Sequence, residues 1–187
     1  MADKLWPNGL VVCIASGPSL SAADCELVRK AELPTIAVNS SYKLASFAQV
    51  VYGGDKCWWD AYGQAVPEKA IKVTCTQQAA LHHDLYLHRC YGEYNSGMRA
   101  IQYAVDQGAS KVVLLGYDCS LKYGSHWHGD HQKTANPNLI KVKLWHKQFA
   151  TVAAQAKALG VCVVNCSAYT ELQCFPTGKL TDHLSHA

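Results

Sequence analysis

The strongest constraint on the fold of this chain is the regular alternation of short apolar runs with helical segments. The apolar runs have the length and composition of β-strands and lie at residues 9–15, 34–38, 48–52, 70–75, 85–87, 111–115 and 161–164. Helical patterns lie between them, at residues 20–30, 97–107 and 139–159. Alternation of this kind predicts an α/β fold, with a mainly parallel sheet and helices on both of its faces.

Composition places the chain among globular proteins with a substantial core. Its 187 residues fit a single domain, and 49% of them are hydrophobic and 17% charged, which excludes a disordered tail and a coiled coil. The net charge of +3 is too small to indicate a nucleic-acid binder. The sequence has no apolar run long enough to predict a membrane span. Nine cysteines without a CxxC pair, most of them inside apolar runs, predict reduced thiols and a cytoplasmic protein.

Small and polar residues follow the predicted strands at the points where the strands end. They lie at residues 16–19, 39–40, 53–55, 116–118 and 165–167. In an open parallel sheet, the ligand crevice lies outside the carboxyl ends of the strands. We therefore expect a single Rossmann-like domain over residues 1–187 whose strand-end loops bind a polar, phosphate-bearing ligand.

Two of these segments open helices and are candidate phosphate sites. In the turn at residues 16–20, Gly17 permits close approach of a ligand, and Ser19 precedes a helix start, where free N–H groups attract anions. The turn lacks the lysine of a Walker loop and the three glycines of a dinucleotide-binding turn. Residues 95–97 open a later helix, where we expect Ser96 to be the cap. An ordinary tight turn and an ordinary cap are the alternatives.

A dense group of histidines occupies residues 126–131, with the sequence HWHGDH. Neutral imidazole suits proton transfer near pH 7, so His126, His128 and His131 are candidate catalytic bases. Histidine and aspartate also bind zinc, and the spacing matches the HxHxDH motif of metallo-β-lactamase-type hydrolases. Those enzymes take a further histidine from each of two later segments, and they are built on an αββα sandwich. The strand–helix pattern of this sequence does not predict such a sandwich. A solvated loop with incidental histidines is another alternative.

The ordered series ASGPSL, VNSS, YGGD, NSG, LLGYD and NCS resembles a known group of nucleotide-dependent transferases. The group contains the family 42 bacterial sialyltransferases, the motility-accessory-factor glycosyltransferases and the 6-hydroxymethylpterin diphosphokinases, and short phage-encoded proteins carry a similar motif series. The resemblance covers roughly residues 9–175. Together with the strand-end positions, it gives the candidate nucleotide-binding residues: Gly17, Pro18, Ser19, Asn39, Ser40, Gly54, Asp55, Asn95, Ser96, Gly97, Gly116, Asp118 and Tyr123.

The resemblance also implies a mechanism. A mobile segment at residues 119–137 would close over the nucleotide, with Tyr123 on the phosphate and one of the three histidines as general base for an acceptor hydroxyl. A CMP-linked sugar is the favoured donor. A diphosphate or nucleotidyl transferase that uses ATP and a nucleotide-binding protein without turnover are the alternatives. No residue is assigned to a metal, although a divalent metal is left open, and the acceptor and the oligomeric state are not specified.

Overall fold

The computed structural model describes residues 3–184. Within this range, seven strands form one sheet in the order β5-β4-β3-β2-β1-β6-β7, and every neighbouring pair is parallel. The strands are β1 (Leu10–Ile14), β2 (Thr35–Val38), β3 (Val50–Tyr52), β4 (Ile71–Thr74), β5 (Tyr86–Leu87), β6 (Lys111–Leu115) and β7 (Cys162–Asn165). The predicted α/β, Rossmann-like fold is confirmed.

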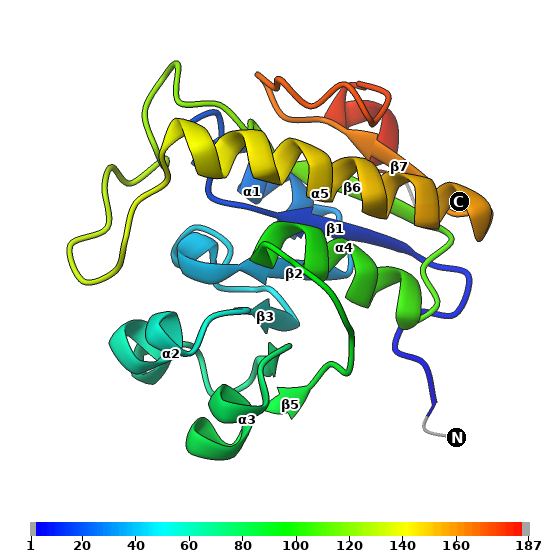
Figure 1. Ribbon diagram of the computed structural model, residues 1–187. Coiled ribbons are helices and arrows are strands. Elements are labelled where there is room, and N and C mark those ends of the chain that lie inside the picture. Colours follow the sequence, from blue (N-terminus) through cyan, green and yellow to red (C-terminus); the bar gives the residue numbers. More distant parts are fainter. Residues whose placement is uncertain (1–2, 185–187) are drawn as a thin grey trace.

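Helices cover both faces of this sheet (Figure 1). They are α1 (Ala22–Lys30), α2 (Lys56–Tyr62), α3 (Gln77–His83), α4 (Ser96–Asp106) and α5 (Leu139–Ala158), and short 3-10 helices lie at η1 (Asn39–Lys43), η2 (Gly63–Ala65) and η3 (Leu180–His183). Helices α4 and α5 pack on one face, and α1, α2 and α3 pack on the other. None of the helices in residues 3–184 is both long and apolar enough to cross a bilayer.

The two apolar layers arise from the two-residue period of the strands. In β1, Val11 and Cys13 point into the layer under α4 and α5, while Val12 and Ile14 point into the layer under α1 and α2. All four side chains are fully buried. A strand in this position must be apolar along its whole length, which is why residues 9–15 show no polar alternation.

The direction of the strand order reverses at β1. The chain proceeds outward from β1 through β2, β3, β4 and β5, and then returns to place β6 on the other side of β1. The loop after β1 leads to α1 on one face of the sheet, and the loop after β6 leads to α5 on the other face. A crevice therefore opens between the two loops at the carboxyl ends of the strands. This topology predicts where a ligand pocket forms.

Gly116, which directly follows β6, provides a test of the close packing between the ends of β1 and β6. Its φ of +68° lies in the left-handed region, and a Cβ atom there would collide with the carbonyl oxygen of Ala15 at the end of β1. Gly160 has a similar φ of +73° but open space around it. We predict that G160A lowers the free energy of unfolding by about 1–2 kcal/mol, the cost of a left-handed alanine. G116A should lose about 1–3 kcal/mol more, because the side chain is also overpacked. Urea denaturation measures both, and equal losses would contradict this account of the packing.

Candidate functional site

A pocket lies at the reversal point, outside the carboxyl ends of β1, β2 and β6. It holds about 670 Å³ of empty space including its open mouth. We call it the strand-end pocket. Nine of the predicted site residues line it: Gly17, Pro18, Asn39, Asn95, Ser96, Gly97, Gly116, Asp118 and His126.

The other predicted residues lie outside this lining. Gly54 donates its N–H to the hydroxyl oxygen of Ser96 at 3.0 Å and so helps to position this lining residue. Asp55 accepts a hydrogen bond from the Tyr94 hydroxyl at 3.2 Å. Tyr123 is 62% exposed and packs against Tyr169, with ring centroids 4.9 Å apart. Ser19 also lies outside it, and Ser40, His128 and His131 line a second hollow that is described below.

The start of α4 supplies free backbone donors to the pocket. Asn95, rather than Ser96, is the N-cap, and its side-chain oxygen accepts the N–H of Met98 at 2.8 Å. Within residues 3–184, the N–H groups of Ser96 and Gly97 have no hydrogen-bond partner. Such N–H groups, together with the helix dipole, form an anion-binding site. A Cβ atom on Gly97 would crowd the rings of Tyr117 and Phe149, which leaves a hydrogen atom as the side chain that fits best here.

The turn after β1 is occupied by a buried carboxylate. Asp118, which is 1% exposed, accepts the N–H of Ser19 at 2.8 Å and its hydroxyl at 2.6 Å. The N–H of Gly17 donates to the carbonyl of Gly116 at 2.8 Å. Helix α1 begins only at Ala22. The N–H groups of Gly17 and Ser19 therefore bind the protein itself, whereas those of Ser96 and Gly97 at the start of α4 have no partner among the described residues.

Asn39 places an unpaired oxygen at the pocket. It follows β2 directly, has a φ of +49° and begins η1. Its side-chain oxygen is buried and has no hydrogen-bond partner among the described residues. A buried acceptor without a partner costs free energy, so a bound ligand that donates a hydrogen bond here would remove this cost.

Aromatic side chains from the loop after β6 and from α5 form part of the pocket lining, which we call the aromatic wall. Tyr117 and Phe149 are buried and contact each other edge to face, with ring centroids 5.7 Å apart, and Trp145 is partly exposed beside them. Sequence reasoning did not select these residues. The available signal was the spacing of Trp145 and Phe149, which places them on one face of the predicted helix 139–159. A wall of this kind suits a planar base or a sugar ring.

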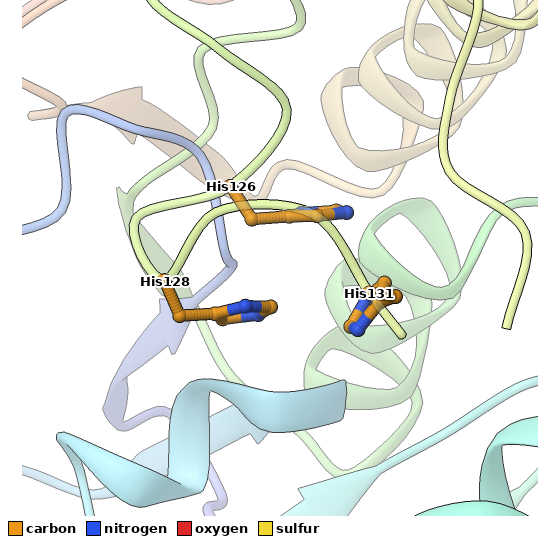
Figure 2. A group of neighbouring side chains, drawn as sticks. All are labelled: His126, His128 and His131. Carbon is orange, nitrogen blue, oxygen red and sulfur yellow. The ribbon is translucent and has the colours of Figure 1, made fainter. Parts of the chain in front are cut away.

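Three imidazoles converge at the rim of the pocket. We call His126, His128 and His131 the histidine cluster. One ring nitrogen from each lies within 4.8 Å of the others. His126 and His128 extend side by side toward His131, and their rings stack with centroids 5.1 Å apart (Figure 2). The Nε2 atoms of His126 and His128 are buried and have no partner among the described residues.

All three imidazoles favour the neutral form. Burial, followed by the neighbouring His131 and His128, lowers the pKa of His126 to about 4. Burial is also the main cause that lowers the pKa of His128 and of His131. At neutral pH, the cluster therefore presents unprotonated nitrogens.

Backbone contacts bring the cluster together within the predicted mobile segment 119–137, which contains no helix or strand. The N–H of Trp127 donates to the carbonyl of Ser16 at 3.0 Å, which ties the loop to the end of β1. Gly129, with a φ of +77°, reverses the chain. Asn136 then binds the backbone of His131 through two hydrogen bonds, of 2.7 and 3.0 Å. The last histidine is thus folded back onto the first two.

A second hollow lies on the other side of the cluster, with about 630 Å³ of empty space including its mouth. Its lining is polar and carries two lysines: Ser40, Lys43, Tyr62, His128, Asp130, His131, Gln132 and Lys133. Because His126 lines the strand-end pocket and His128 and His131 line the second hollow, the cluster lies between the two.

No model of a known protein family matches this sequence, and a search of curated proteins found no match. The resemblance to the sialyltransferase group stays a prediction, and the site is interpreted from its own geometry. The parallel sheet is not the αββα sandwich on which HxHxDH hydrolases are built.

The contact between Ser19 and Asp118 predicts a pH-dependent loss of stability. Burial raises the pKa of Asp118, and the two hydrogen bonds from Ser19 oppose this rise by stabilising the carboxylate. S19A removes a hydrogen bond to a charged group, which contributes about 1.5–3 kcal/mol. The deficit in unfolding free energy should be largest near neutral pH and should shrink at a pH below 3.8, the ordinary value above which the pKa of Asp118 is raised, because the carboxyl is then mostly protonated.

The matched control is S110A, which removes a hydroxyl bonded to the neutral carbonyl of Asn8. Urea denaturation at both pH values measures the two deficits. A deficit of S19A that is as independent of pH as that of S110A would show that the Asp118 carboxylate does not depend on Ser19.

Proposed function

We propose that this protein is a nucleotide-dependent transferase, with a sugar-linked nucleotide as donor and a hydroxyl compound as acceptor. The donor occupies the strand-end pocket and the acceptor occupies the second hollow. The observation that carries the proposal is the position of the histidine cluster between these two spaces. A proton acceptor is needed at this place when a hydroxyl attacks a bound donor.

Three features of the strand-end pocket support a phosphorylated nucleoside. The unpaired N–H groups of Ser96 and Gly97 suit a phosphate. The unpaired oxygen of Asn39 suits a hydrogen-bond donor on the base or sugar. The partly exposed ring of Trp145 offers a face for stacking. The phosphate is assigned to α4 rather than to the turn after β1, because in that turn the donors of Ser19 bind the Asp118 carboxylate and the N–H of Gly17 binds the Gly116 carbonyl.

The chemistry follows from this arrangement. The acceptor hydroxyl loses its proton at the histidine cluster while its oxygen attacks the anomeric carbon of the donor, and the bond from that carbon to the phosphate oxygen breaks. The charge that develops on the phosphate is stabilised by the helix start of α4. The irregular segment 119–137 lines the mouth of the pocket through Ser125 and His126 and is placed to exclude water during transfer.

A thermal-shift panel of CMP, UDP, GDP, ATP and their sugar-linked forms tests the donor site. A ligand at 100 times its dissociation constant adds about 2.7 kcal/mol of stability, which raises the melting temperature by about 5–10 °C for a chain of this size. CMP and its sugar-linked form are the expected ligands. N39G should weaken binding by about 2–10-fold, because one hydrogen bond is lost while glycine accepts the left-handed backbone.

The control is N8G, since Asn8 has a φ of +58° and is exposed in the turn that precedes β1. No shift with any member of the panel would contradict the proposal. If a nucleotide binds but its sugar-linked form gives no product with any sugar acceptor, the protein is a nucleotide-binding protein rather than a transferase.

A further inference from the structure

The histidine cluster has the composition and spacing of a metal site. Three imidazoles form the protein ligand set of one class of catalytic zinc sites, in which the fourth position is left to water or substrate. Among the described residues, two groups of histidine, cysteine or acidic side chains are close enough to hold a metal ion. The histidine cluster is one and is half-buried, whereas the other (Asp60, His82 and His83) is mostly exposed.

We propose that His126, His128 and His131 bind one divalent transition-metal ion of the zinc type, with one coordination position left open. The binding itself does not depend on the transferase proposed above. What the ion does in catalysis does rest on that proposal.

The distances support this assignment. Zinc–nitrogen bonds of about 2.0–2.1 Å in a tetrahedral site separate the ligand nitrogens by roughly 3.3–3.4 Å. The three nitrogens of the cluster lie within 4.8 Å of one another. Each needs to move by less than about 1 Å to reach the ion, which side-chain rotation provides.

The hydrogen bonding also supports it. The Nε2 atoms of His126 and His128 are buried without partners, a costly arrangement that a metal ion would relieve. The other ring nitrogen of His126 lies 3.2 Å from the Ser16 hydroxyl. Metal-bound histidines have a partner of this kind, which orients the ring and fixes its tautomer.

Charges of both signs lie near the cluster. Lys43 lies close enough to lower the pKa of His128 and of His131, and its charge opposes a cation. Asp130 acts in the opposite direction on His126 and on His131. Three neutral imidazoles suit zinc, copper, nickel or iron in preference to magnesium or calcium.

In the transferase, the ion changes which group accepts the proton. Imidazole nitrogens that bind the ion no longer take up a proton. Instead, a bound water releases a proton to solvent, and the resulting hydroxide accepts the proton of the acceptor hydroxyl and becomes water again. The alkoxide oxygen then attacks the donor. All three histidines are needed for this step, whereas a single general base would need only one of them.

Titration of the chelator-stripped full chain with Zn²⁺, followed by calorimetry, tests the proposal. We expect one tightly bound equivalent, with the affinity reduced by at least about 100-fold in H128A and in H131A, since loss of an outer-shell partner alone costs about 10–100-fold. S16A should fall within that outer-shell range. Co²⁺ in place of Zn²⁺ should give the visible absorption of a tetrahedral nitrogen-bound ion in the native chain but not in H131A.

The matched control is H82A, which alters the exposed second group and should leave the tight equivalent unchanged. The proposal is overturned if the native chain binds no stoichiometric Zn²⁺, or if H82A removes the binding and H128A does not. Urea denaturation of H128A checks that the variant is folded. His128 does not line the strand-end pocket, so H128A should keep nucleotide binding. Metal binding without nucleotide binding would contradict the transferase alone, and the reverse would contradict the metal site alone.

Discussion

The parallel pairing of β1 with β6 is the contact on which the rest of the structure depends. The two strands pair along their full length, from Leu10 with Lys111 to Ile14 with Leu115, and they separate the two directions in which the sheet grows. Because both strands end at the same level, the turns that follow them must pass each other closely. Gly17 and Gly116 permit this, since a side chain on either would collide with the backbone of the other turn. The pocket exists because these turns pack against each other and then diverge.

The same contact explains why a carboxylate is buried at the site. Asp118 lies in the turn that follows β6, and its carboxylate accepts two hydrogen bonds from Ser19 in the turn that follows β1. The two turns are therefore held together by charge-assisted hydrogen bonds. The arrangement costs desolvation, which is why the pKa of Asp118 is raised. It also occupies the N–H and hydroxyl of Ser19, whereas the N–H groups of Ser96 and Gly97 at the start of α4 stay unpaired among the described residues. Ser16 also positions the histidine cluster beside the pocket, since its carbonyl accepts the N–H of Trp127 and its hydroxyl lies within hydrogen-bond distance of His126.

The sequence predicted the sheet well, since short apolar runs bounded by turn residues, such as 111–115, are typical of buried strands. It did not predict α2 and α3, because each has seven residues and too few turns to show a helical period. The resemblance implies that Tyr123 contacts the phosphate, and this stays a prediction. Its packing against Tyr169 could not be predicted, since an irregular segment has no periodicity from which a direction can be derived. The convergence of the histidines depends on the φ of Gly129 and on the hydrogen bonds of Asn136, which spacing alone does not reveal.

The central claim is that the loops at the carboxyl ends of β1, β2 and β6 form one site for a phosphorylated nucleoside. The most direct measurement is a titration with a nucleotide, followed residue by residue through the backbone amide signals in NMR spectra. The account predicts the largest shifts at the N–H groups of Ser96 and Gly97, with smaller shifts around Asn39 and Gly17. It predicts no shift at Gly9 or Ser110, which precede β1 and β6 at the amino ends of the strands. Shifts centred on the amino ends of the strands, or no shifts at Ser96 and Gly97, would contradict this account.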